Sequence, residues 1–250
     1  MKNLPEQIAL RKSLSEERFK PYLVEAQKYF NAPAEANERA LELYSWAAEL
    51  AGMFHTQISY VEVATRNALS LELSNWSAAR GHSKKWTRRN RDSDLYQIVN
   101  QPDIGRAIGL IKREKVRSYN PTHDDIIAKL TFSFWVNLVK DQKQPSDTFR
   151  QLLWEQSLNY AFSYSQDHDE HGRLDLEKTR RLTADQLSSV LTLRNRIAHH
   201  DNLLRVQYEL LIHRIYAVLG RIGGENLTQS IDPAPLRAHI AVDPRNSWSC

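Results

Sequence analysis

The feature that most constrains the fold of this sequence is a long stripe of largely apolar side chains with helical spacing. Between about residues 35 and 76 these side chains recur every three or four positions, which places them on one helix face, whereas a strand would need strict alternation. The members of the stripe are Leu41, Tyr44, Ala48, Ala51, His55, Ile58, Val61 and Ala64 or Thr65. The segment therefore predicts one or two long helices, with Gly52 as a candidate joint.

The rest of the chain has the same helical period and few residues that break it, because only 8 of the 250 residues are glycine. Further helices are predicted at about residues 15–30, 93–117, 123–140, 146–164, 183–200 and 204–222. Asn120-Pro121 and Gln144-Pro145 are predicted breaks, because proline opposes helix continuation. We therefore predict an all-α protein.

Composition predicts three parts of the chain. Residues 1–34 form a helical extension, residues 35–224 a helical domain, and residues 225–250, which are rich in Pro, Ser and Asn, an irregular tail. Within the domain, the polar segment 166–175 is a predicted surface loop. Adjacent histidines and carboxylates in a flexible loop make a poorly organised metal site, so we predict no metal and no other cofactor.

Features that the sequence lacks restrict the cellular compartment that we expect for the protein. Its single cysteine, Cys250, excludes a disulfide framework within the chain. The most apolar run, near residues 132–139, is far shorter than the roughly 20 residues that span a bilayer, and the N-terminus lacks a secretory apolar core. We expect a cytoplasmic protein without membrane contacts.

The net charge of +4 allows a polyanionic partner without requiring one. Cations gather in two stretches, Lys84 to Arg91 and Lys112 to Arg117. Either these stretches are solvated loops and helix ends, or they contact nucleic acid. In the second interpretation RNA is bound by Lys84, Lys85, Arg88 and Arg89, and Trp86 stacks on a base.

Two further residues have alternative interpretations. Glu62 precedes Arg66 by four residues, which is the spacing of an ion pair on a helix surface. Alternatively, Arg66 or its neighbour Asn67 binds RNA. Trp135, between Phe134 and Val136, is predicted to lie in the core.

The segment LRNRIAHHDN, residues 193–202, combines two arginines, an asparagine and two histidines. Its helix is predicted to begin near Ala184, because Thr183 and Gln186 have the spacing of a capping box. Arg194 then falls near the centre of an apolar stripe formed by Leu187, Val190, Leu191, Ile197 and Ala198. An arginine aimed at a core or an interface needs an anionic partner.

Arg194 and His199 are five residues apart and diverge by about 140° around a helix, whereas Asn195 and His199 share a face. One straight helix therefore does not bring both tips to one small target. The end can unwind, a long side chain can wrap round, or a second copy can supply the missing half. A two-fold dimer along this helix would gather two arginines and two histidines in one cleft.

Such a cleft has the chemistry to cut a phosphodiester without a metal. Arginine holds phosphate, and histidine exchanges a proton with a ribose 2′-hydroxyl or with the leaving 5′-oxygen. RNA carries that nucleophile and would give a 2′,3′-cyclic phosphate and a 5′-hydroxyl. The alternative is structural: Arg194 pairs with a core carboxylate, and His199 and His200 occupy a helix C-terminus that favours cations.

Arg194-Asn195-Arg196-Ile197-Ala198-His199 resembles the signature of the HEPN superfamily of ribonucleases, in which arginine, a polar residue and about three further residues precede histidine. Together with VEVATRNAL at 61–69 and LTFSFWV at 130–136, RNRIAHHDN resembles the Abi-like (abortive infection) family of phage-defence proteins. The resemblance covers about residues 40–220.

This resemblance implies an all-helical HEPN fold, a homodimer whose cleft is lined by the motif, and a metal-independent, toxin-like endoribonuclease. By position, Arg194 and His199 would be catalytic and Asn195 would orient them. Arg196 and His200 form a second, shorter arginine–histidine spacing and are additional candidates. A toxin also needs a restraint, such as an antitoxin made of RNA or protein. The competing functions are a non-catalytic RNA-binding module and a purely structural helical dimer.

Overall fold

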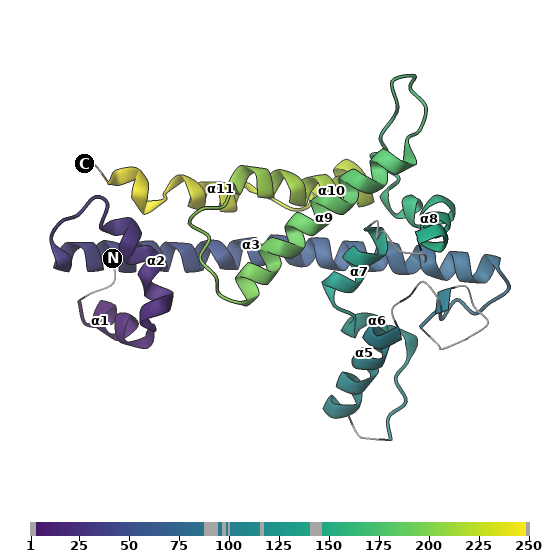
Figure 1. Ribbon diagram of the computed structural model, residues 1–250, viewed down its shortest axis with the longest axis horizontal. Helices are drawn as coiled ribbons and strands as arrows, with labels where there is room; N and C mark the ends of the chain where they lie inside the picture. Colours follow the sequence, from purple (N-terminus) through teal and green to yellow (C-terminus); the bar gives the residue numbers. More distant parts are fainter. Residues whose placement is uncertain are drawn as a thin grey trace. The chain divides into compact units, whose positions relative to one another are not determined.

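The computed structural model describes residues 4–87, 95–96, 99, 101–115, 118–140 and 147–248. The described residues form helices and no strand, which confirms the all-α prediction (Figure 1). The α-helices are α1 (Leu4–Ser13), α2 (Glu16–Ala26), α3 (Pro33–Ala79), α5 (Gln101–Glu114), α6 (His123–Lys129), α7 (Phe132–Val139), α8 (Asp147–Gln156), α9 (Leu176–Ala198), α10 (Tyr208–Gln229) and α11 (Ala234–Ala241). Two 3-10 helices are η1 (Leu158–Phe162) and η2 (Pro244–Ser247). No helix among the described residues is long and apolar enough to cross a bilayer.

The long stripe forms one continuous helix, α3, of 47 residues, and Gly52 is not a joint in it. The predicted face is only partly the buried one. Ile58, Val61 and Thr65 are buried as expected, but Ala48 and His55 are exposed. In the first half of α3 the neighbouring face carries larger side chains, Leu43, Leu50 and Phe54, and these are buried instead. Burying the larger apolar area releases more free energy, so the alanine-rich face is left outside the core.

The described helices fall into two compact units. Unit 1 comprises Met1–Ile58, Thr192–Ile212 and Asp232–Cys250, and unit 2 comprises Ser59–Leu191 and His213–Ile231. This division differs from the predicted parts. The N-terminal extension and the C-terminal segment, residues 232–250, both belong to unit 1. The expectation of an irregular tail at 225–250 is wrong: α10 ends at Gln229, and α11 and η2 follow. Prolines mark the starts of these two short helices, where a missing N–H costs no hydrogen bond.

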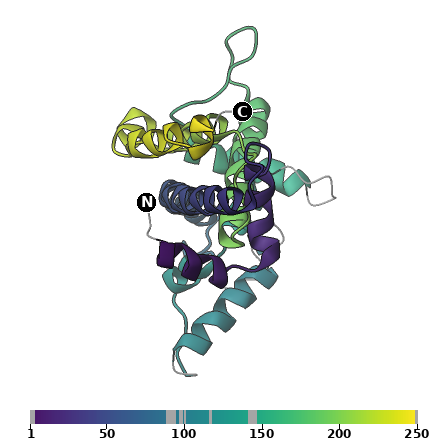
Figure 2. The same cartoon turned by 90° about the vertical axis from the view of Figure 1, so that its left-hand side faces the viewer.

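Unit 1 joins the beginning of α3 to α2 and to the C-terminal segment. The N-terminal helices, purple in Figure 2, lie beside the beginning of α3. Tyr22 of α2 packs edge-on against Tyr44 of α3, at 5.2 Å between ring centroids. Trp46 stacks on His239 at 5.7 Å. The same pair is joined by hydrogen bonds from Trp46 Nε1 to the His239 carbonyl and between His239 Nε2 and the Trp46 carbonyl, both 3.0 Å. These contacts fix the C-terminal segment to the first half of α3.

Unit 2 has an aromatic core, and its described residues include the buried arginines Arg180 and Arg221. Trp135 is 1% exposed, as predicted, and Trp154 and Phe162 are fully buried. Arg221 donates to the Ser165 carbonyl, to Asp167 and to Gln186 at 2.6–3.2 Å. The segment 166–175 is a loop, as predicted, and stands away from the helices of unit 2 in Figure 1. Asp167 therefore anchors one end of this loop to a buried cation.

Several helix boundaries differ from the predictions. The segment 123–140 divides into α6 and α7, because Thr131 accepts a hydrogen bond from the Phe134 N–H and caps a new helix. Helix α9 begins at Leu176 rather than near Ala184, because Asp175 caps it by accepting from the Lys178 N–H at 2.8 Å. Thr183 is fully buried in the middle of α9. The Asn120-Pro121 break is confirmed, whereas Gln144-Pro145 lies outside the described residues.

Candidate functional site

The predicted catalytic residues lie at the C-terminal end of α9, in unit 1. Leu193 and Ile197 are buried there, Asn195 and His199 are exposed, and Arg194 is half-buried. Arg194 therefore lies at the edge of the apolar stripe and not near its centre, because Leu193 takes the central position. Arg194 Nη1 donates to Asn195 Oδ1 at 3.4 Å. The motif presents its polar side chains on the solvent side of the last helical turn.

Helix α9 ends in a tight turn at His200. His200 has a φ of +55°, its N–H donates to the Ile197 carbonyl at 3.0 Å, and the Asp201 N–H donates to the Arg196 carbonyl at 2.8 Å. These two bonds are the Schellman pattern, which usually has glycine at the left-handed position. A histidine there costs roughly 1 kcal/mol in backbone conformation. The sequence gives no glycine to mark this helix end.

A cation from α2 closes the same turn. Arg18 Nη1 donates to the carbonyls of His199 and His200, at 2.7 and 2.5 Å. Carbonyls at the end of a helix lack intrahelical partners and carry partial negative charge, so a guanidinium is favourable there. The structural alternative gave this role to the side chains of His199 and His200. In the structure Arg18 fills it, and both imidazoles are exposed.

The helix does not unwind before His199, because the His199 N–H still donates to the Asn195 carbonyl at 2.9 Å. With this bond in place, Arg194 and His199 keep their divergence of about 140° around the axis. One of the three ways to unite them, an unwound helix end, is thereby excluded. A second copy and a long side chain remain.

A hollow of about 310 Å³ adjoins this helix end within unit 1. The alanine-rich face of α3 lines it, and so do His200 and Asp201. His199 is not among its lining residues. The other lining residues are Tyr22, Tyr44, Ala47, Ala48, Ala51, Gly52, His55, Ile197 and Leu203. Burial raises the pKa of Tyr22 to about 12, so its phenol is neutral at physiological pH. Most of the misassigned stripe residues of α3 thus line a hollow beside the motif.

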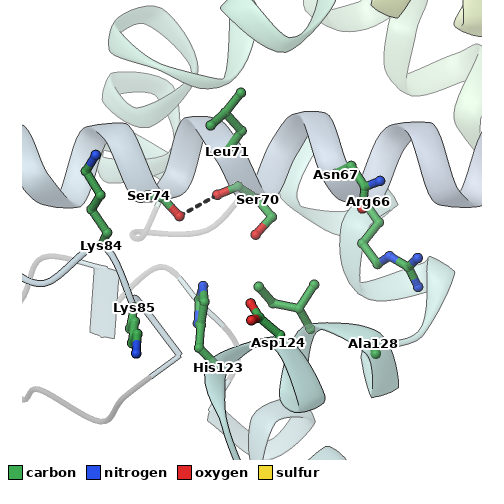
Figure 3. A pocket seen from close by; sticks show the side chains of 11 residues that line it. Arg66, Asn67, Ser70, Leu71, Ser74, Lys84, Lys85, His123, Asp124 and Ala128 are labelled. Carbon is green, nitrogen blue, oxygen red and sulfur yellow. Dashed lines mark hydrogen bonds between the residues drawn. The ribbon is translucent and has the colours of Figure 1, made fainter.

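Four of the predicted RNA-binding residues line a second pocket, in unit 2, with a volume of about 600 Å³. Arg66 and Asn67 come from α3, Lys84 and Lys85 from the segment after it, and α6 supplies the opposite wall (Figure 3). Arg66 Nε is buried and has no hydrogen-bond partner among the described residues.

Trp86 does not offer a face for a base to stack on, contrary to the prediction. Its ring is 7% exposed and lies parallel to Phe134 at 6.3 Å and edge-on to Trp135 at 6.0 Å. Its Nε1 donates to Ser70 Oγ at 3.4 Å. The large apolar area of indole makes burial favourable even between charged neighbours. Arg88 and Arg89 lie outside the described residues.

Sequence reasoning missed His123 and Asp124, which line the same pocket from the first turn of α6. His123 Nδ1 lies 2.8 Å from Thr87 Oγ1, and the ring packs edge-on against Trp86 at 5.6 Å. The available signal was the capping box of Thr122 and Asp125 directly after Pro121. That pattern starts a helix at His123 and exposes its first side chains.

A family model described as Abi-like protein matches residues 12–205. The match spans well over half of the chain, from α1 to the segment after α9. The chain belongs to the Abi-like family. No curated protein and no solved structure matches this Abi-like chain. The matched range contains both the motif at the end of α9 and the pocket of unit 2.

In this Abi-like protein the polar loop 166–175 uses its central carboxylate to hold its own backbone. Asp169 accepts hydrogen bonds from the N–H groups of His171 and Arg173 and from Arg173 Nε, at 2.8–3.0 Å. These bonds, led by that from the Arg173 N–H, lower the pKa of Asp169. The carboxylate thus stabilises the turn that closes at Gly172, whose φ is +75°.

Proposed function

We propose that this Abi-like protein is a metal-independent endoribonuclease of the HEPN type. The observation that carries the proposal is the end of α9, where Asn195 and His199 are exposed beside half-buried Arg194 on a turn closed by Arg18. A helix end built only for stability would not need an exposed amide and imidazole in this arrangement. The chemistry of these three side chains fits RNA cleavage by its own 2′-hydroxyl.

In the proposed reaction the 2′-oxygen attacks phosphorus and the bond from phosphorus to the 5′-oxygen breaks. Arg194 binds the phosphate and offsets the charge that develops on its oxygens. His199 accepts the proton of the 2′-hydroxyl, and a water molecule donates a proton to the departing 5′-oxygen. Asn195 orients the Arg194 guanidinium through their hydrogen bond. The products are a 2′,3′-cyclic phosphate and a 5′-hydroxyl.

The site is proposed to form between two copies of the chain. The intact helical geometry up to His199 keeps Arg194 and His199 of one chain apart around the helix, as the bond from the His199 N–H to the Asn195 carbonyl requires. A two-fold dimer in which the chains meet along α9 brings Arg194 of one chain to His199 of the other.

His200 and Arg196 are the alternative pair for the same chemistry. Both side chains are exposed, and His200 lines the hollow of unit 1. With His200 as the proton carrier, that hollow would hold part of the substrate beside it. His199 is preferred because it matches the spacing of the motif.

Family membership supports a role in abortive infection. Cutting cellular or phage RNA in the cytoplasm would stop translation in an infected cell. The partners are then RNA, a second copy of the chain and an antitoxin, either RNA or protein, that restrains the activity. Lys84, Lys85, Arg66 and Asn67 are the proposed RNA-binding residues outside the motif.

A non-catalytic RNA-binding module is the second candidate. The observation that favours it is the pocket of unit 2, where Arg66, Lys84 and Lys85 come together without any part of the motif. Under this alternative the protein holds a structured RNA and cuts nothing.

Cleavage in the presence of EDTA tests the proposal. The wild-type chain and a His199→Ala variant are incubated with total cellular RNA, and the fragment ends are mapped. His213→Ala is the matched control, because it removes an exposed histidine outside the motif. The expected result is 2′,3′-cyclic phosphate ends from the wild type and the control and none from His199→Ala.

Each other outcome has a distinct meaning. Equal cutting by His199→Ala contradicts the assignment of His199 and directs the test to His200→Asn, since asparagine tolerates the left-handed backbone at that position. Retention of a specific RNA without cutting by the wild type favours the binding module.

A further inference from the structure

The pocket of unit 2 has the size of a site for one small molecule. Its volume of about 600 Å³ lies within the range of roughly 300–1,000 Å³ that is typical of ligand pockets. α3 supplies one wall, α6 the facing wall, and Lys84 and Lys85 lie at one end (Figure 3). All the described residues that line it belong to unit 2.

The pocket is electrostatically suited to an anion with two negative charges. Among the described residues that line it are three cations, Arg66, Lys84 and Lys85, and one carboxylate, that of Asp124. Lys84 and Lys85 are exposed. A phosphomonoester carries nearly two negative charges at neutral pH, whereas each phosphodiester of an RNA chain carries one. The two neighbouring lysines therefore match a terminal phosphate better than an internal one.

Arg66 supplies a further cation at the end of the pocket opposite Lys84 and Lys85 (Figure 3). Its guanidinium group has N–H donors and no acceptor. The donors that reach the pocket suit the hydroxyl groups of a sugar or the acceptors of a base. Arg66 therefore fits the nucleoside part of a ligand, and the two lysines fit its phosphate.

The remaining lining groups suit a nucleoside attached to that phosphate. Asn67 presents an amide, which can donate and accept hydrogen bonds at a base edge or a sugar. Ser70 Oγ accepts from Trp86 Nε1, so its own hydroxyl proton is directed to another acceptor. Ile127 and Ala128 add apolar surface from α6. His123, held by Thr87, forms a fixed part of the same wall.

We propose that this pocket binds a nucleotide through its phosphomonoester, with Lys84 and Lys85 at the phosphate and Arg66 and Asn67 at the opposite end of the pocket (Figure 3). The nucleotide is either free or the 5′-phosphorylated end of an RNA, because both carry the same group. The second case extends the proposed RNA-binding role, but neither case depends on RNA cleavage.

Calorimetric titration of the full chain tests this assignment with four probes. Adenosine 5′-monophosphate is compared with adenosine, and a 2′-O-methyl RNA oligomer with a 5′-phosphate is compared with the same oligomer ending in a 5′-hydroxyl. The methylated oligomers lack the nucleophile and cannot be cut, so failure of the ribonuclease proposal does not affect the result. We expect each phosphorylated probe that binds to do so about tenfold or more tightly than its unphosphorylated partner.

Paired variants locate the binding. Lys84→Gln with Lys85→Gln should weaken binding of the phosphorylated probe about tenfold, because two charges at the phosphate are removed. Lys112→Gln with Arg113→Gln removes two exposed cations of α5 that do not line the pocket, and should leave affinity unchanged. All four positions are exposed, and thermal unfolding verifies that both variants fold.

The outcomes separate the two sources of the nucleotide. Binding of free adenosine 5′-monophosphate identifies a small-molecule site, and binding of the phosphorylated oligomer alone identifies an RNA end. The proposal is overturned if the phosphate makes no difference, if both double variants lose affinity equally, or if no phosphorylated probe binds at about 1 mM.

Discussion

Two of the arginines of helix α9, Arg180 and Arg194, lie in opposite environments. Arg180, in unit 2, is 2% exposed and donates to the carbonyls of Val139 and Lys140 and to Gln151 Oε1, at 2.7–3.3 Å. Arg194, in unit 1, is half-buried and lies among the exposed side chains of Asn195 and His199. The first guanidinium is enclosed by acceptors from its own chain, and the second reaches a polar surface.

The difference separates residues that the fold uses from residues that a ligand can use. A buried guanidinium is tolerated only when its donors have acceptors. Arg180 therefore contributes to the free energy of unfolding through its acceptors. Under the proposed function, Arg194 is the residue that binds a phosphate. The amino-acid sequence around the two arginines does not show which one is buried. The motif drew attention to Arg194, and the role of Arg180 was not predicted.

The largest expected effect is on RNA cleavage by Arg194→Ala. We expect the rate to fall by about 10²–10³-fold, because the group that stabilises transition-state charge is lost. The free energy of unfolding should change by about 1 kcal/mol or less, because Arg194 is half-buried and not enclosed. Arg205→Ala, an exposed arginine of the same unit outside the motif, is the control for charge and should cut like the wild type. A large loss of stability in Arg194→Ala would erase the contrast with Arg180.

Arg180→Met should show the opposite pattern. The free energy of unfolding in urea is expected to fall by about 3 kcal/mol, since the Val139 and Lys140 carbonyls lose their buried donor. Arg181→Met removes the same group from the adjacent, exposed position and should have little effect. Equal stabilities for the two variants would show that the buried network contributes nothing.

His200→Gly should stabilise the chain by about 1 kcal/mol, because glycine adopts the left-handed conformation without the steric cost paid by histidine. His199→Gly, one residue earlier in a helical bond pattern, should destabilise it by a similar amount. Chemical denaturation measures both changes. Destabilisation by His200→Gly would contradict the assignment of a strained turn.

The smallest expected effect concerns two neighbouring carboxylates. Asp125 is hydrogen-bonded within the fold, and Asp124 lines the pocket of unit 2. Asp125 accepts hydrogen bonds from Tyr119 Oη and from the Thr122 N–H and Oγ1, at 2.6–2.9 Å, and these lower its pKa to about 2. Its carboxylate therefore stabilises the fold above the ordinary value of 3.8, and that contribution is lost as the pH falls through about 2.

Unfolding measured between pH 4 and pH 2 checks this assignment. Asp125→Asn should show a shallower loss of stability on acidification than the wild type. Asp124→Asn removes a carboxylate that faces the pocket of unit 2 and leaves the three hydrogen bonds of Asp125 in place, so it should follow the wild-type slope. A steeper slope for Asp125→Asn would contradict the account.

Periodicity predicted the helical class and the position of α3, but it did not decide which face of α3 is buried. Apolar residues occupy two neighbouring faces in the first half of this helix, and packing selected the one with Leu43, Leu50 and Phe54. Tyr44, Ala48 and His55 line the hollow instead. The competition between two apolar faces is settled by tertiary packing, which a single helix does not encode.

The residues of the candidate site are a prediction from the sequence, whereas its geometry comes from the structure. The motif identified Arg194, Asn195 and His199, and charge clustering identified Lys84 and Lys85. The turn at His200 and its closure by Arg18 depend on a contact across more than 180 positions, which no local pattern signals. The contributions of His123 and Asp124 to the pocket arise the same way, because α6 reaches α3 only in the folded unit.

The most direct test of the account is complementation between two inactive chains. Arg194→Ala and His199→Ala variants, each expected to be inactive alone, are co-expressed with different tags, and mixed dimers are purified by both tags. If the site combines Arg194 of one chain with His199 of the other, the mixed dimer contains one intact pair and regains cleavage to 2′,3′-cyclic phosphate ends. Purified mixed dimers that cut no RNA would contradict a site shared between two copies.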